Sequence, residues 1–324
     1  MSGAPLLLVH PGDHGVAVYA RDLATAVIER SDEIRTIDPS ALGRLPEGTA
    51  VHAHFTDRLW GDSPEEASRT FEGLARRLRV SVTLHDLPQE SDGERNRPRR
   101  REAYALVAAA ATGVVVNSAH ERALLREEGV WTGAATAIPL PVELQADAVE
   151  PASDGSLGVL GYFYPGKGHD EAARAAATAG MTRMTVLGRA SDGHAADLDA
   201  FVRRAADLGV EVEVTGWLDD REIARRGRAV AVPVIAHRHI SASGSLASWI
   251  GWGRRPIAVR NRYIDEMAML RPGTLSTVDE TGLAEAVRRA VGLPRTTWHG
   301  LARLALSRAD VADAYLRFWA PGRR

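Results

Sequence analysis

The sequence of 324 residues contains no cysteine. This absence excludes a disulfide framework, a thiolate metal site and a thiol nucleophile, and it leaves the redox compartment open. The chain also lacks a strong excess of charge of either sign, because its formal net charge is −2. We therefore expect no nucleic-acid partner, since such proteins usually carry a marked basic excess.

Long apolar runs are missing as well. The first ten residues hold a five-residue apolar run, at 5–9, without a basic segment before it. A later run, at 105–116, has the pattern of a small-residue helix that leads into a buried strand. Both are shorter than the roughly 20 residues that cross a bilayer, and the first does not fit a signal peptide. We expect a cytoplasmic protein.

Short apolar runs alternate with longer helical patterns in the first half of the chain. The apolar runs lie at 5–9, 49–54, 80–84 and 113–117, and the helical patterns at 17–28, 65–78 and 103–111. Strands this apolar have no face for solvent. The pattern therefore predicts an α/β fold, with a parallel sheet covered by helices on both sides.

The pattern starts again after a stretch rich in proline, aspartate, glycine and serine, at 150–156. We predict two Rossmann-like domains, 1–149 and 150–300. A C-terminal helix predicted at 301–319 could pack on either domain, and we assign the segment 301–324 to the first. In open parallel sheets, ligands bind beyond the carboxyl ends of the strands, so we expect the two domains to face each other across a cleft that holds the site.

The loop at 161–168 reads Gly-Tyr-Phe-Tyr-Pro-Gly-Lys-Gly and follows the first strand of the second half. Its spacing matches a phosphate-binding P-loop up to Lys167, but Gly168 stands where that motif needs a hydroxyl for magnesium. A P-loop-like nucleotide hydrolase is therefore a weaker alternative. A lysine at the start of a helix still suits a phosphate, while a solvent-facing lysine explains the same pattern.

The loop at 10–15 lacks the third glycine of the dinucleotide fingerprint. A nicotinamide enzyme, with Asp38 on the ribose, is thus disfavoured. Gly15 nevertheless allows a ligand to approach the backbone closely.

Three histidines end early strands of the first half, His52, His54 and His85. The first two share a face and could begin a metal site, but no third ligand is evident, so we predict no metal. His85 is the stronger site candidate because an apolar run delivers it to the carboxyl end of a strand. A hydrogen-bonded structural histidine is the alternative.

Arginine is concentrated at 95–101, where five of seven residues are arginine. An exposed loop explains this segment, and so does a site for an anionic sugar acceptor or a peripheral contact with lipid head groups. Both readings stay open. Arg99 and Arg100 are the acceptor-binding candidates.

A serine-rich helix start follows the apolar run at 230–236. Capping explains one serine, but Ser241, Ser243 and Ser245 surround Gly244. Three hydroxyls at a helix N-terminus suggest a site for an anion, in the same domain as Lys167.

Several short motifs occur in a fixed order along the chain. They lie at 14–24 (His-Gly-Val-Ala-Val-Tyr-Ala-Arg-Asp-Leu-Ala), 51–55 (Val-His-Ala-His-Phe), 83–86, 116–118, 138–142, 167–170, 214–217 and 253–256. In this order they resemble the retaining GT-B glycosyltransferases of glycosyltransferase family 4, over nearly the whole chain. The resemblance implies that the first domain binds the sugar acceptor and the second a nucleotide diphosphate sugar, without metal or cofactor. It places His85 near the transferred sugar, Lys167 on the diphosphate and Gly15 in the glycine loop.

Two departures from the family pattern bear on activity. Tyr162 and Phe163 stand where the family commonly has arginine, and the positions of its two glutamates fall near Ile240 or Ser241 and on Ser248. The resemblance implies a hexosyltransferase that acts on a glycan, lipid-linked or small-molecule acceptor with retention of configuration. A catalytically silent homologue that only binds sugar nucleotides is the main alternative.

Overall fold

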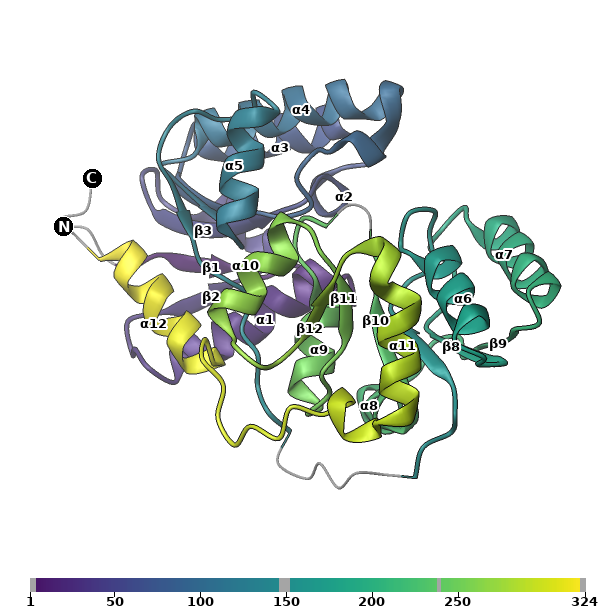
Figure 1. Cartoon of the computed structure of the whole chain (residues 1–324). Coiled ribbons are helices and arrows are strands. Elements are labelled where there is room, and N and C mark those ends of the chain that lie inside the picture. The colour runs from purple at the N-terminus through teal and green to yellow at the C-terminus, as the bar shows by residue number, and fades with distance from the viewer. Residues whose placement is uncertain (1–3, 146–151, 238–239, 321–324) are drawn as a thin grey trace. The chain divides into compact units, whose positions relative to one another are not determined.

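The computed structural model describes residues 4–145, 152–237 and 240–320. The chain forms two compact units. Unit 1 comprises Met1–Pro141 with Leu306–Arg324, and unit 2 comprises Val142–Ala305. The domain boundary predicted at 149/150 lies outside the described residues. Each unit contains one six-stranded parallel sheet with helices around it, which confirms the predicted α/β class (Figure 1).

Unit 1 is a doubly wound sheet in the order β2-β1-β3-β4-β5-β6, with all pairs parallel. Its strands are β1 (Leu6–Leu8), β2 (Arg35–Ile37), β3 (Ala50–Phe55), β4 (Arg79–Leu84), β5 (Gly113–Val116) and β6 (Ala135–Ala137). Its helices are α1 (Gly15–Ile28), α2 (Asp57–Trp60), α3 (Pro64–Ala75), α4 (Gly93–Ala110), α5 (Ala119–Glu127) and α12 (Arg308–Trp319).

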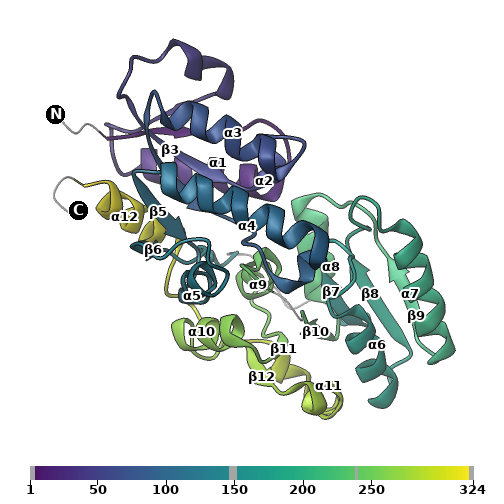
Figure 2. The same cartoon turned by 90° about the horizontal axis from the view of Figure 1, so that it is seen from above.

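Successive residues of the strands of unit 1 enter different cores. Val114 and Val116 of β5 pack with α3, α4 and α5, whereas Val115 packs with α1 and α12. This is the period of two that a strand buried on both faces requires. Figure 2 shows α3 and α4 side by side over one face of the sheet.

The C-terminal helix belongs to unit 1. Helix α12 packs against α1 (Figure 1), and Arg30 forms an ion pair with Asp313. The helix begins later than predicted because Ser307 and Asp310 form a capping box, so residues 301–306 are not helical.

Unit 2 has the strand order β12-β11-β10-β7-β8-β9, again all parallel. Its strands are β7 (Leu157–Leu160), β8 (Arg183–Leu187), β9 (Glu211–Val214), β10 (Val232–Ile235), β11 (Ile257–Val259) and β12 (Ser276–Val278). Its helices are α6 (His169–Thr178), α7 (Ala195–Asp207), α8 (Asp220–Ala229), α9 (Gly244–Gly251), α10 (Arg262–Leu270) and α11 (Leu283–Gly292).

Helices cover both faces of the second sheet. Helices α6, α7 and α11 share a core with one face, and α8, α9 and α10 share a core with the other. Trp249 of α9 is fully buried in the second of these cores. Among the described residues, no helix is both long and apolar enough to cross a membrane.

Candidate functional site

Unit 2 contains a topological switch point between β7 and β10. These strands are neighbours, but α6, which follows β7, packs on one face of the sheet, and α9, which follows β10, packs on the other. In such sheets the crevice for a ligand lies at the carboxyl ends of the two diverging strands. The loop with Lys167 and the residues that follow β10 lie at this edge.

Gly168 allows these two connections to touch. It is the N-cap of α6 and has φ 90°, and a Cβ atom at this position would lie 2.2 Å from the carbonyl oxygen of Ala236. No other residue fits there without backbone movement. The glycine therefore brings the start of α6 against the end of β10.

Lys167 is buried in this loop, with 8% of its surface exposed, and it is the only lysine in the sequence. Its Nζ atom lies 5.6 Å from the centroid of the Tyr164 ring. Burial lowers the pKa of Lys167 to about 8, because water no longer solvates the ammonium group. Within the described part of the chain, this amine forms no ion pair.

Two buried histidines lie near Lys167. Burial, together with the charge of Lys167, lowers the pKa of His169 to about 3. The pKa of His237 is lowered by the same two causes. The ring of His169 packs 4.7 Å from Phe163, and its two nitrogens have no hydrogen-bond partner among the described residues. The two imidazole rings near the Lys167 amine are therefore uncharged.

The serine-rich segment forms the start of α9. Ser243 is its N-cap, and its Oγ atom accepts a hydrogen bond of 3.1 Å from the amide of Leu246. The Ser243 and Ser245 Oγ atoms are 3.1 Å apart, and Ser241 is buried. Gly244 is exposed, and a Cβ atom added to it would have no other atom within 4 Å. Capping thus accounts for one hydroxyl.

A cavity of about 350 Å³ opens beside the loop that carries Lys167. It is bounded by this loop and the first turns of α6, and the Lys167 side chain does not line it. Arg174 and Arg204 reach it, and each forms an ion pair with an acidic residue of α6. The cavity is therefore close to charge balance.

Unit 1 has its own switch point, between β1 and β3. Helix α1 begins at this edge with Gly15, which is exposed and would have no atom within 4 Å of an added Cβ. The His14 side chain caps the helix by accepting a hydrogen bond of 3.2 Å from the amide of Val16. The first turn of α1 thus presents open backbone.

The three predicted histidines lie together, with His52 in the middle of β3, His54 near its end and His85 directly after β4, and they form what we call the histidine cluster. His54 Nδ1 lies 3.0 Å from His85 Nε2. His52 instead lies 2.9 Å from Ser81 Oγ and 3.0 Å from Thr83 Oγ1. Burial lowers the pKa of His52 and of His85 to about 3, and that of His54 well below its usual value. All three rings are therefore neutral at pH 7.

Tyrosines close the histidine cluster. The Tyr315 hydroxyl, from α12, lies 2.9 Å from Thr83 Oγ1 and 3.4 Å from the Tyr19 hydroxyl. The Tyr19 ring packs edge-on against His54 and His85, with centroids 5.3 and 5.5 Å away. The C-terminal helix thus contributes directly to this edge of unit 1.

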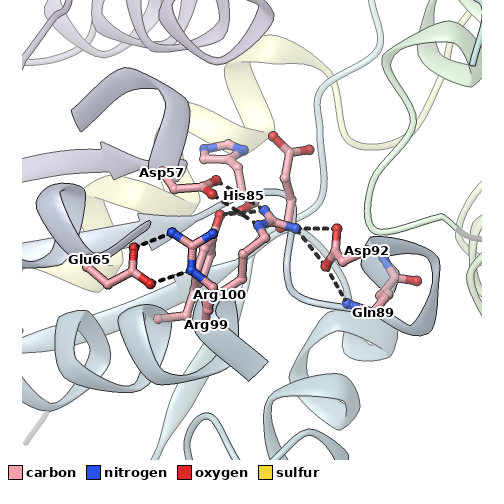
Figure 3. A network of polar contacts seen from close by, with 9 residues as sticks. Asp57, Glu65, His85, Gln89, Asp92, Arg99 and Arg100 are labelled. Atoms are coloured by element: carbon pink, nitrogen blue, oxygen red, sulfur yellow. Dashed lines mark hydrogen bonds and ion pairs between the residues drawn. The ribbon is translucent and has the colours of Figure 1, made fainter. Parts of the chain in front are cut away.

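The arginine-rich segment is helical, and its reading as an exposed loop is wrong. It forms the first part of α4, and carboxylates of unit 1 hold Arg97, Arg99 and Arg100, the last two of which are drawn in Figure 3. Arg99 makes a two-bond ion pair with Glu65, at 2.6 and 2.8 Å. Arg100 binds Asp57 and Asp92, and only 13% of its side chain is exposed. These partners neutralise the charge that would otherwise oppose a helix.

Arg100 also holds the backbone that carries His85. It donates a 2.6 Å hydrogen bond to the carbonyl oxygen of Asp86, a residue with φ 50°. The Tyr104 hydroxyl donates a 2.8 Å hydrogen bond to the carbonyl oxygen of His85. Figure 3 shows Arg100 between its carboxylate partners, with His85 nearby.

The sequence did not single out several residues that complete these edges. His237 and Tyr263 in unit 2, and Tyr19, Asn117 and Tyr315 in unit 1, contact the predicted residues or share their electrostatic surroundings. Asn117 follows an apolar strand, which is the signal that identified His85. The described residues contain no group of three histidine or acidic side chains placed to hold a metal ion.

The two six-stranded parallel sheets with their surrounding helices match the GT-B fold of glycosyltransferases of known structure. No protein-family model matches the sequence. A search of curated proteins also gives no match.

Three solved structures illustrate the likeness. Sucrose-phosphate synthase from Thermosynechococcus elongatus has a TM-score of 0.67 at 16% identity, over 98% of this chain and 94% of its own. Anabaena HepE, in complex with UDP and glucose, has a TM-score of 0.64 at 15% identity, over 97% and 94%. The pneumococcal O-GlcNAc transferase GtfA, in complex with UDP and GlcNAc, has a TM-score of 0.61 at 11% identity, over 86% and 58%. At these identities, the structural likeness shows a common fold alone.

Proposed function

We propose that the chain is a hexosyltransferase that moves a sugar from a nucleotide diphosphate donor to a glycan, lipid-linked or small-molecule acceptor. Lys167 carries the proposal. It is a buried amine at the switch-point edge of unit 2, without an ion pair among the described residues. A cation removed from water is stabilised when an anion joins it, and a diphosphate supplies that charge.

We place the donor diphosphate against Lys167 and the first amides of α9. Those amides lack intrahelical partners, and the helix dipole favours an anion there. Ser241, Ser243, Gly244 and Ser245 would form the wall of this donor site. The Ser243 hydroxyl caps the helix and the Ser243 amide donates to the Tyr263 hydroxyl, so this residue would shape the wall while Gly244 and Ser245 offer their amides.

Unit 1 supplies the second part of the proposal. Gly15 would let donor atoms approach the first turn of α1, and His85 would lie near the transferred sugar. Arg99, with 39% of its side chain exposed, would meet an anionic acceptor by exchanging Glu65 for it. Arg100 would do so less readily, because two carboxylates hold it.

The expected reaction is retaining and needs no metal. The donor's own phosphate would assist the departure of the leaving group and the entry of the acceptor hydroxyl. This route needs no carboxylate nucleophile from the protein, so serines where the family has glutamates are compatible with it. The absence of the two family glutamates would instead change donor affinity and sugar preference.

Donor binding by the full chain and by Lys167→Met tests the proposal. A thermal-shift panel of UDP, GDP, ADP and TDP sugars comes first, and UDP-glucose and UDP-GlcNAc are leading candidates because similar folds bind UDP with those sugars. Methionine keeps the length of the side chain and removes its charge. Loss of a charge-assisted hydrogen bond, roughly 1.5–3 kcal/mol, should weaken donor binding about tenfold or more.

Arg174→Met is the matched control, because this side chain lies on the neighbouring helix and is 55% exposed. It should leave donor affinity unchanged. Equal affinity in wild type and Lys167→Met would remove the basis of the proposal. Binding without transfer or donor hydrolysis would indicate the silent homologue, and magnesium-dependent hydrolysis of ATP or GTP the hydrolase.

A further inference from the structure

The Asn117 side chain determines where the proton of the His85 ring lies. Its Nδ2 atom is 3.3 Å from the carbonyl oxygen of Leu84 and 3.4 Å from His85 Nδ1. A carbonyl oxygen can only accept, so it requires the NH2 group of Asn117 at this place and excludes the flipped amide. The second hydrogen of that group then points at His85 Nδ1, which must accept it.

The tautomer of His85 in turn determines the tautomer of His54. A neutral His85 whose Nδ1 accepts has its proton on Nε2, and this atom lies 3.0 Å from His54 Nδ1. His54 Nδ1 must therefore accept, and the proton of His54 lies on its own Nε2. We propose that Asn117 and His54 are positioning residues that hold His85 as its Nε2-protonated tautomer in one ring orientation.

Burial keeps the rings of His54 and His85 neutral, as the proposed tautomers require. His54 and His85 are 4% and 6% exposed, and loss of hydration lowers the pKa of His85 to about 3. The backbone of His85 is fixed from the other side by the Tyr104 hydroxyl. The imidazole is thus held at both nitrogens and at its main chain.

This order has a chemical consequence that rests on the proposed function. Both nitrogens of His85 are already hydrogen-bonded, so the ring offers no free lone pair to remove a proton from a sugar hydroxyl. The chain of hydrogen bonds from Asn117 ends in the N–H of His54. A sugar or phosphate oxygen that reaches the pair would meet a donor, which stabilises developing negative charge without proton transfer.

Nitrogen-15 NMR of the full chain, labelled on histidine, reads the tautomers directly and needs no substrate. We expect His85 and His54 each to show a protonated, pyrrole-type Nε2 and an unprotonated, pyridine-type Nδ1. His54→Asn and His85→Asn identify the two sets of signals by their loss. A pyrrole-type Nδ1 on His85 in the wild-type chain would overturn the inference.

Asn117→Asp gives a sharper test, because it replaces the NH2 group by an oxygen of similar size. His85 should then be protonated on Nδ1, and His54 should change tautomer as well, although it does not touch residue 117. His52→Asn is the matched control. His52 lies on the same strand and face as His54, but its hydrogen bonds are with Ser81 and Thr83. In folded Asn117→Asp, an unchanged His54 beside a neutral His85 that is protonated on Nδ1 alone would contradict the proposed order.

Turnover separates this inference from the proposed function. If the chain is a transferase, Asn117→Asp should lower kcat by about tenfold or more with little change in donor KM, since a positioned group in the transition state is misplaced. His52→Asn should retain kcat. A chain with the expected tautomers that transfers no sugar would remove the function and leave the tautomer assignment intact. A chain that transfers sugar but shows other tautomers would remove the tautomer assignment alone.

Discussion

Arg254 offers a quantitative test of what stabilises unit 2. The residue is 1% exposed, and its guanidinium carbon lies 4.3 Å from the centroid of the Trp298 ring. It donates hydrogen bonds of 2.5–3.2 Å to the carbonyl oxygens of Arg228, Val230, Ala231 and Thr297 and to Thr297 Oγ1. One side chain thus joins the end of α8, the start of β10 and the segment before residue 300.

Arg254→Met removes the donors and keeps an apolar stem of similar length. Each buried carbonyl left without a donor costs about 1–3 kcal/mol, and local movement recovers part of the sum. We expect a loss of about 3–5 kcal/mol in the free energy of unfolding of unit 2, a large part of the roughly 5–15 kcal/mol of a typical domain. Arg254→Lys should lose less, because one amine can still reach some of the carbonyls.

Urea unfolding followed by tryptophan fluorescence and far-UV circular dichroism measures this loss. The two units need not unfold together, so separate transitions should be fitted where they occur. Arg260→Met is the control, because its ion pair with Asp265 is about half exposed on each side and should contribute less than about 1 kcal/mol. If Arg254→Met and Arg260→Met shift the urea midpoint equally, the hydrogen bonds from Arg254 to the carbonyl oxygens do not stabilise unit 2.

Three further predictions concern the proposed sites and the pH. His85→Ala should lower turnover by a factor on the order of a hundred with a small change in donor affinity; a loss of stability alone would make His85 structural. Gly244→Val should block donor binding in a calorimetric titration, whereas Ser248→Ala, one turn further into α9, should have little effect. The pKa values of His52 and His85 are near 3 in the folded chain and about 6.5 when unfolded, so the unfolded chain takes up protons first. The urea midpoint of unit 1 should therefore fall as the pH drops from about 6.5 towards 3, and should show no contribution from these rings above that range.

The architecture could be predicted because buried strands and helices require apolar residues at characteristic spacings in the sequence. A strand such as β5, with three consecutive valines, can only lie in a sheet covered on both sides, and a helical pattern followed each of the three apolar runs before it. The short edge strands β2, β6 and β12 are half exposed and carry little of this signal. Helix α4 was read too short because its first turns hold charges and Pro98, and the carboxylates that pair with them come from distant segments.

The candidate sites were predictable residue by residue, but their partners were not. His85 and Lys167 stood out because each follows an apolar strand. The hydrogen bond between His54 and His85 joins residues 31 apart, and the Tyr315 hydroxyl reaches Thr83 across 232 residues. Such pairings depend on strand order and helix packing, which a periodic pattern does not encode.

The single lysine of this chain has a practical consequence. Arginine supplies every other permanently cationic side chain, and reagents that acylate or reductively alkylate primary amines leave guanidinium groups intact. Apart from the N-terminus, such a reagent has one target, and that target is a buried amine whose pKa of about 8 leaves part of it unprotonated and nucleophilic near neutral pH. Coupling this protein to a surface through its amines would use either the N-terminus or the residue proposed to hold the donor, whereas a carbon-13 methyl group placed on Lys167 would report on that residue.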